Sequence, residues 1–141
     1  MEYLNIDFTP PADVAATAAD GLALREKYKR GGTAVGLMRA HQLASRQKLS
    51  PQIVKQMHKF FQRHIRNKDN KKKNGSPSNG QISWKMWGGD AAFAWASQII
   101  AKIKEADIAI KTKLAKLSDS LDRIGLRNEA NQIDNLLKKL T

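Results

Sequence analysis

The sequence contains no cysteine, only four prolines, and 13 acidic residues against 25 lysines and arginines. Without cysteine the chain can form neither a disulfide scaffold nor a thiolate zinc site, and it has no cysteine nucleophile. No apolar run approaches the roughly 18–20 residues that cross a bilayer, so we expect no membrane partner. Residues 1–5 have neither the basic nor the apolar segment of a signal peptide. These absences favour a soluble, basic protein.

The 141 residues correspond to about one average domain, and 41% of them are hydrophobic, which is enough for a core. The net charge of +12 is concentrated in residues 41–75, which hold ten basic residues and one acidic residue. Concentrated like charge destabilises a compact state, and a polyanionic partner compensates for it. Such a partner is a nucleic acid, an anionic membrane or an acidic protein face. The alternative is a solvated face followed by a mobile lysine-rich loop.

Periodicity and capping signals predict helix almost throughout the chain, and no β-hairpin signal appears. The expected helices cover residues 10–30, 33–45, 50–64, 78–87, 90–124 and 126–140. The predicted fold class is all-α, with an N-terminal bundle of about four helices followed by a long antiparallel αα-hairpin. We divide the chain into a basic helical globular domain, 1–95, whose loop at 67–80 is rich in Lys, Asn and Gly, and a C-terminal helical hairpin, 96–141.

Four residues are expected to cap helix N-termini. Thr9 precedes Pro10 and Pro11, Thr33 follows a pair of glycines, Ser50 precedes a proline, and Asp90 follows the second pair of glycines. Hydroxyl and carboxylate oxygens at these positions accept hydrogen bonds from the first free amides of a helix.

The C-terminal region carries the longest periodic pattern. Gly125 separates two apolar series that step alternately by three and four residues, as in helices that pack lengthwise. The first series is Ile100, Ile103, Asp107, Ile110, Leu114, Leu117, Leu121 and Ile124, and the second is Leu126, Ala130, Ile133, Leu137 and Leu140. Asp107 is expected to face solvent or to pair with a lysine of the N-terminal helices. The shorter second helix leaves Ile100 and Ile103 for the N-terminal domain or for a second copy, which makes a homo-oligomer plausible.

The helix expected at 50–64 is strongly amphipathic. Its apolar side carries Val54, Met57, Phe60 and Phe61, and its opposite side carries basic and amide residues. The candidate nucleic-acid-binding residues are the cations of this face and of the segment that follows it: Lys55, Lys59, Arg63, Arg66, Lys68, Lys71, Lys72 and Lys73. The helices at 33–45 and 50–64 have lengths that suit a helix-turn-helix. An ordinary helical pair with a solvated basic face fits them equally well.

Residues suited to catalysis are sparse. His58 and His64 are six apart, which does not place them on one helical face for a shared metal, and no phosphate-binding glycine loop follows a strand. We therefore predict no enzyme, no catalytic residue, no metal site and no cofactor. The aromatic group around Trp84, Trp87 and Trp95 is interpreted as core, with a stacking platform for single-stranded bases as the alternative.

The chain also resembles a small helical domain encoded in many tailed-bacteriophage genomes. The resemblance covers about residues 8–98, and its most specific part is the segment Trp87–Asp90. The matching positions are Gly31-Gly32-Thr33-Ala34-Val35-Gly36, Arg39-Ala40, Leu43, Leu49-Ser50-Pro51, Val54, Met57, Phe60-Phe61-Gln62-Arg63-His64, Pro77-Ser78, Gly80, Ile82, Trp84, Trp87-Gly88-Gly89-Asp90-Ala91 and Ala94-Trp95-Ala96. The C-terminal region, with Leu121-Asp122, Ile124-Gly125-Leu126, Glu129-Ala130 and Ile133-Asp134, is similar to hairpins appended to other phage and bacterial proteins.

The resemblance implies a phage virion or head-assembly protein, found in the virion or in the host cytoplasm during assembly. It implies phage structural proteins or nucleic acid as partners. Relatives continue with acidic residues after the histidine that matches His64, whereas this chain continues with Ile65-Arg66-Asn67-Lys68. This departure favours the polyanion hypothesis. A capsid-binding accessory protein, docking through its hairpin or its tryptophan region, is the alternative function.

Overall fold

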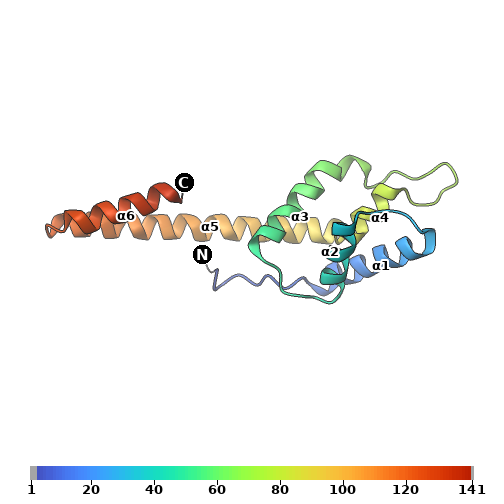
Figure 1. Cartoon of the computed structure of the whole chain (residues 1–141), viewed down its shortest axis with the longest axis horizontal. Helices are drawn as coiled ribbons and strands as arrows, with labels where there is room; N and C mark the ends of the chain where they lie inside the picture. The colour runs from blue at the N-terminus through green and yellow to red at the C-terminus, as the bar shows by residue number, and fades with distance from the viewer. Residues whose placement is uncertain (1–2, 141) are drawn as a thin grey trace. The chain divides into compact units, whose positions relative to one another are not determined.

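The computed structural model describes residues 3–140, which are mostly helical (Figure 1). Its elements are α1 (Ala12–Tyr28), α2 (Ala34–Ala44), α3 (Pro51–His64), the 3-10 helix η1 (Ile65–Asn67), α4 (Asn79–Met86), α5 (Gly89–Arg123) and α6 (Arg127–Lys139). Within residues 3–140 the β pairing amounts to one isolated bridge, between Lys71 and Pro77. The all-α prediction is confirmed.

The chain divides into two compact units, Asp7–Ile100 and Met1–Ile6 together with Ala101–Thr141. α1 to α4 belong entirely to the first unit and α6 to the second. α5 begins in the first unit and ends in the second.

Local capping explains where most helices of the first unit begin. The Thr33 hydroxyl accepts from the Gly36 amide, the Ser50 hydroxyl accepts from the Ile53 amide, and Ser78 forms a reciprocal capping box with Gln81. The caps predicted at Thr33 and Ser50 are confirmed.

The two other predicted caps are wrong. α1 begins at Ala12 after an extended Pro11, and the Thr9 amide donates instead to Asp7 Oδ1 at 2.9 Å. Because a residue that precedes proline avoids the helical region, Pro10 cannot start a helix before Pro11. α5 begins at Gly89, so Asp90 lies inside its first turn.

In the first unit, α1 packs against α2 and α4. The crossing of α1 and α4 is so close that a Cβ on Gly21 would lie 2.4 Å from the Met86 backbone nitrogen. Met86, Leu43 and Val14 are fully buried in this unit. Glycine therefore permits two helix backbones to touch here.

α3 contributes its apolar side to the same core, as predicted. Val54, Met57, Phe60 and Phe61 are all buried. Around Phe61 the rings form a cluster: Trp84 meets it edge-on at 4.9 Å between centroids, and Phe93 stacks on it at 5.3 Å.

The tryptophans belong to the core rather than to an exposed platform. Trp84, Trp87 and Trp95 are 5%, 9% and 8% exposed. The interpretation of the aromatic group as core is therefore confirmed, and the stacking platform is not present.

In the second unit, a turn at Gly125, with φ of +87°, separates α5 from α6. The buried Ser118 hydroxyl of α5 lies 2.8 Å from Asp134 Oδ1 and 3.2 Å from the Ala130 carbonyl oxygen, both in α6. Ala130 is fully buried. These contacts join the C-terminal part of α5 to α6.

One expectation for this unit is corrected, and of the two alternatives for Ile100 and Ile103 the structure fits the one that needs no second copy. Asp107 accepts a hydrogen bond from the Tyr3 hydroxyl at 2.9 Å, so its partner is a tyrosine from the chain's beginning and not a lysine. Ile103 is 2% exposed and Ile100 is half-buried, so these side chains are largely covered within one chain. The exposed large apolar residues described in the second unit are Leu4, Ile108, Leu117, Ile124, Leu126 and Leu136.

Candidate nucleic-acid interface

The outward face of α3 presents three of the predicted cations. Lys55, Lys59 and Arg63 follow one another at intervals of four residues, and all three are exposed. Burial of the opposite apolar side forces them outward together, since residues four apart share one face of a helix. Arg66, in η1, is exposed as well.

Lys68 differs from the other candidates because its charge already has a partner. Its ammonium nitrogen lies 3.2 Å from both carboxylate oxygens of Asp90 and 5.9 Å from the centre of the Trp84 ring. The indole of Trp84 donates to the same carboxylate at 2.9 Å. Asp90, at the start of α5, therefore holds Lys68 against the domain, and the assignment of Lys68 as a binding residue stays a prediction.

The lysine-rich loop is held by its own backbone and by one arginine. The Lys72 amide donates to the Ser76 carbonyl at 3.0 Å, next to the isolated bridge of Lys71 and Pro77. The Arg30 guanidinium donates to the Pro77 carbonyl at 2.7 Å and to Asn79 Oδ1 at 2.8 Å. These contacts order the lysine-rich loop, in contrast to the mobile loop of the alternative hypothesis.

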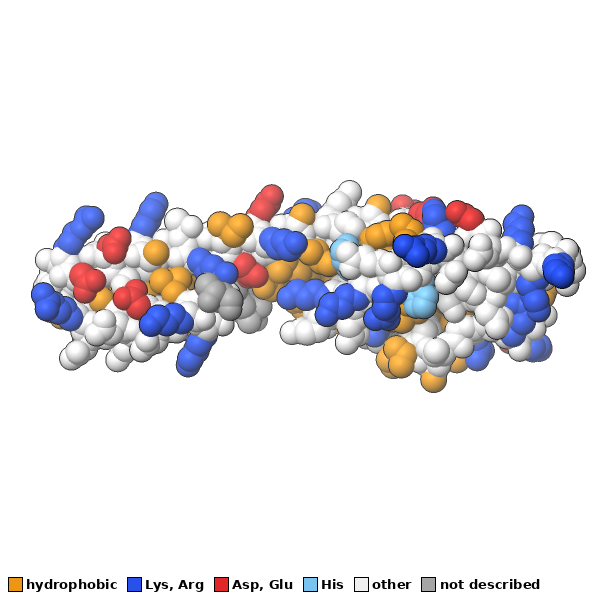
Figure 2. Space-filling view, turned by 90° about the horizontal axis from the view of Figure 1, so that it is seen from above, with side chains coloured by type: hydrophobic (Ala, Val, Ile, Leu, Met, Phe, Trp, Pro, Cys, Tyr) orange, Lys and Arg blue, Asp and Glu red, His pale blue; other side chains and the backbone are white. Residues whose placement is uncertain are grey.

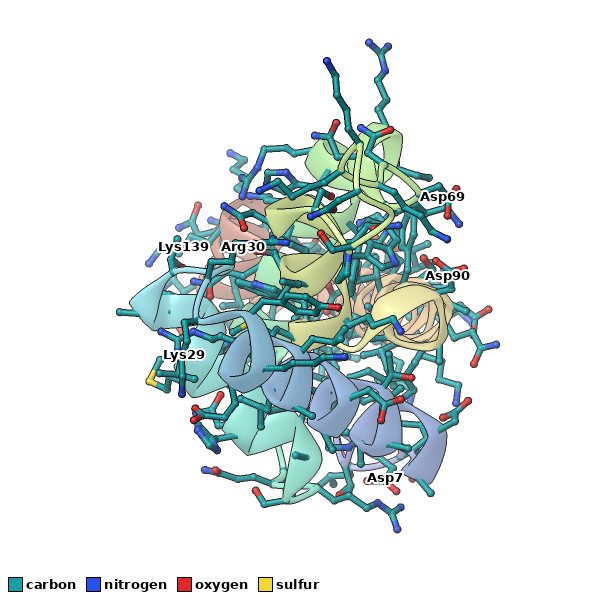
Figure 3. The ribbon with its side chains drawn as sticks, turned by 90° about the vertical axis from the view of Figure 1, so that its right-hand side faces the viewer. Asp7, Lys29, Arg30, Asp69, Asp90 and Lys139 are labelled. Atoms are coloured by element: carbon teal, nitrogen blue, oxygen red, sulfur yellow. The ribbon has the colours of Figure 1, made fainter. Side chains whose placement is uncertain are left out.

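The side chains of Lys71, Lys72 and Lys73 are nevertheless all exposed. Figure 3 shows long side chains of the end of α3 and of the loop extending away from the ribbon, with Asp69 in the loop. We call the seven exposed candidates the basic surface: Lys55, Lys59, Arg63, Arg66, Lys71, Lys72 and Lys73.

No member of the basic surface forms an ion pair or a side-chain hydrogen bond with any residue in the range 3–140. Figure 2 shows blue lysine and arginine side chains spread over one face of the molecule, with pale blue histidines among them. An uncompensated group of cations is the arrangement that attracts a polyanion.

A groove of about 570 Å³ opens beside this surface, between α2, α3 and α4. Its charged side chains are Lys59 and Arg63, next to His64. Its uncharged polar side chains are Thr33, Gln56, Asn79 and Ser83, and its apolar ones are Val35, Phe60 and Trp87. No carboxylate lines it.

The groove as a whole was not predicted because its residues come from three separate segments, 33–35, 56–64 and 79–87. Gln56, on the amide-rich side of the helix at 50–64, had a local signal. Thr33 had a signal as a helix cap but not as a groove residue, and Ser83 had none, because nothing in the sequence indicates which helices meet.

Arg39, in α2, is only 3% exposed and supports the groove from within the domain. Its guanidinium lies 5.6 Å from the centre of the Trp87 ring, and its Nη2 lies 3.5 Å from Gln56 Oε1. Its Nη1 donates to Gln42 Oε1, while its buried Nε has no acceptor among the described residues. Burial lowers the pKa of the Arg39 guanidinium below its ordinary value.

The remaining features bear on metals and membranes. Within residues 3–140, no three His, Asp or Glu side chains gather where they could hold a metal ion. Among the helices of that range, none has the length and apolar character required to span a bilayer.

The chain was compared with known proteins at three levels. No protein-family model matches it, and no curated protein or solved structure matches it either. The resemblance to a phage-encoded helical domain stays a prediction from the sequence.

Proposed function

We propose that the protein binds nucleic acid, without catalysing a reaction, through the basic surface. The observation that carries the proposal is that seven exposed cations lie on α3, η1 and the following loop without an acidic partner among the described residues. Each such cation can neutralise a phosphate and release a counterion, which is the main source of sequence-independent affinity.

Binding to phosphates is favoured over reading of bases. α2 packs against α1 and α4, whereas α2 and α3 do not pack closely as the two helices of a helix-turn-helix do. The Lys71–Lys73 segment lies in a loop, and flexible lysines contact a backbone rather than base edges.

The proposal places this function in a bacteriophage virion or its head assembly, on the strength of the sequence resemblance. In this proposal the chain consists of an N-terminal helical bundle, which contacts the polyanion, and a C-terminal αα-hairpin. An acidic face of a phage structural protein would satisfy the same cations.

The second candidate is a capsid-binding accessory protein that docks through its C-terminal helices. Ile108 and Ile124 are 63% and 71% exposed, and Leu117 is 46% exposed. Leu117 lies on α5, and Ile124 follows the last residue of α5, in the turn before α6. Exposed apolar side chains of this kind suit a protein partner.

A salt titration of binding to random-sequence duplex DNA separates the two candidates. For nucleic-acid binding, the logarithm of the association constant should fall linearly with the logarithm of salt concentration, by about 0.9 per phosphate contact. The triple variant Lys71→Gln, Lys72→Gln, Lys73→Gln should keep the fold and lower the slope by up to about three units. Absence of binding at low salt would favour the accessory protein.

The matched control replaces three lysines outside the basic surface: Lys104→Gln, Lys113→Gln and Lys116→Gln, all exposed on α5. It removes the same net charge from the chain. Equal losses in the two triple variants would show that total charge, and not the basic surface, determines binding.

A further inference from the structure

The groove between α2, α3 and α4 is lined by two cations together with uncharged polar side chains, whereas the basic surface consists of cations alone. Its volume of about 570 Å³ lies within the range of small-molecule sites, roughly 300–1,000 Å³. Lys59 and Arg63 line it from one side, four residues apart on α3, and no carboxylate lines it to neutralise them.

The opposite side of the groove is formed by the beginnings of two helices. Thr33 and Val35 line it at the start of α2, and Asn79 and Gly80 line it at the start of α4. The positive end of a helix favours an anion, although the Gly36 and Gln81 amides already donate to the Thr33 and Ser78 hydroxyls. Neither helix has an acidic residue in its first turn. These helix ends therefore add to the cations of α3 rather than cancel them.

The groove also has rigid walls. The Phe60 ring stacks on Trp87 at 4.4 Å between centroids and contacts the His64 ring at 4.6 Å, and the Arg39 guanidinium lies 5.6 Å from the centre of the Trp87 ring. These contacts hold the aromatic side chains of the groove in place. The Trp87 indole nitrogen donates to no residue in the described range, and it lies 3.2 Å from where a Cβ on Gly36 would be.

A second, smaller cavity lies beside the first. Asn79 and Gly80 line both cavities, and Lys72 of the loop lines the second. Cations therefore lie on both sides of the start of α4, Lys59 and Arg63 in the groove and Lys72 in the second cavity. Successive phosphates of an extended strand that crosses the start of α4 would find cations on both sides.

We propose that this groove binds the phosphate group of a nucleotide, with Lys59, Arg63 and His64 as the side chains around the phosphate. Hydrogen bonds from Ser83 and from the amide nitrogen of Gln56 fix the rest of the ligand, and Val35 covers its apolar part. The nucleotide is either free or one unit of a single strand, and the second case deepens the proposed function and rests on it.

Calorimetric titration of the full chain with AMP tests the proposal, with adenosine and inorganic phosphate as partial ligands. AMP should bind more tightly than either part. Arg63→Gln and Lys59→Gln should each weaken AMP binding by about tenfold, since each removes a charge-assisted hydrogen bond. Lys55→Gln is the matched control, because Lys55 is exposed on the same face of α3 but does not line the groove.

Failure of AMP to bind, or an equal loss in Lys55→Gln, would overturn the proposal. A single-stranded oligonucleotide that competes with AMP and loses affinity in Arg63→Gln identifies the strand as the source. An oligonucleotide that does not compete identifies the free nucleotide.

The failures of the two proposals are distinguishable. The triple lysine variant of the loop should weaken duplex binding but leave AMP binding unchanged. If AMP binds but duplex DNA does not bind, or binds independently of salt, the proposed function is rejected and the nucleotide site in the groove is supported. If duplex DNA binds in a salt-dependent way but AMP does not bind, the nucleotide site is rejected and the proposed function is supported.

Discussion

The ring of Phe60 stacks on the indole of Trp87, with centroids 4.4 Å apart and planes inclined by 10°. Phe60 is on the apolar side of α3, four residues before His64, and Trp87 follows the end of α4. This pair therefore fixes α3 against α4 and forms one wall of the groove. The stability of the domain and the shape of the candidate site depend on the same contact.

Phe60→Ala should lower the free energy of unfolding by about 3–5 kcal/mol, because a buried phenyl ring is lost and a cavity remains. Urea unfolding followed by circular dichroism measures this change. Gln62→Ala, at an exposed position of the same helix, should change it by less than about 0.5 kcal/mol. A Phe60→Ala protein as stable as the Gln62→Ala control would show that the stack does not hold the two helices.

Gly21→Ala should destabilise the protein, although alanine in a helix is normally favoured over glycine by about 0.5–1 kcal/mol. The added methyl would lie 2.4 Å from the Met86 backbone nitrogen, and backbone cannot move aside as a flexible side chain can. We expect a loss of about 1–3 kcal/mol, as for other overpacked sites. Thermal unfolding measures it, with the exposed neighbour Asp20→Ala as the control. A higher melting temperature for Gly21→Ala would contradict the close crossing.

Lys68→Gln should change the salt dependence of DNA binding less than Arg66→Gln. Lys68 already pairs with Asp90, whereas Arg66 is exposed and has no partner among the described residues. Loss of Arg66 should lower the slope by about 0.9 if it contacts one phosphate. Equal changes in the two variants would show that DNA displaces Asp90 from Lys68.

The sequence predicts the structural features that depend on residues close together in the chain, such as the buried side of a helix and its cap. The amphipathic pattern of α3 places Val54 and Phe61 inside and Lys55 outside, and Ser50 caps the helix from one residue before it begins. Thr9 fails as a cap for a reason that is also local, the consecutive prolines after it.

Contacts between distant segments are not predicted in this way. Lys68 and Asp90 are 22 residues apart, and Tyr3 and Asp107 are 104 residues apart. The groove joins the starts of α2 and α4 to the outer face of α3. Charge and periodicity indicate the polarity of each position, but only the packing of the helices decides which residues meet.

Ser118→Ala should weaken the contact between α5 and α6. Ser118 is 3% exposed, and its hydroxyl lies within hydrogen-bond distance of Asp134 Oδ1 and of the Ala130 carbonyl oxygen. Its removal should cost about 0.5–1.5 kcal/mol, the net contribution of one hydrogen bond, because Asp134 is exposed and can bind water instead. Hydrogen exchange of the α6 amides should be faster in Ser118→Ala and unchanged in the exposed control Ser120→Ala. Unchanged exchange in both variants would show that apolar packing alone holds α6.

Asp107→Asn should lower the pKa of Tyr3. Burial of the phenol, and then its hydrogen bond to the Asp107 carboxylate and the negative charge of that group, raise the pKa of Tyr3 above its ordinary value near 10. The folded chain therefore keeps the proton to higher pH than the unfolded chain does. The contribution to stability is complete below about pH 10 and is lost as pH rises through the folded-state pKa.

The phenolate absorbance of Tyr3 measures this pKa directly when Tyr28→Phe removes the other tyrosine. Asp107→Asn in that background should move the pKa toward the ordinary value without reaching it, since burial of the phenol persists. Asp119→Asn removes an exposed carboxylate farther along α5 and should leave the Tyr3 titration unchanged. If Asp107→Asn also left it unchanged, the hydrogen bond across 104 residues of sequence would not form in solution, and burial alone would account for the raised pKa.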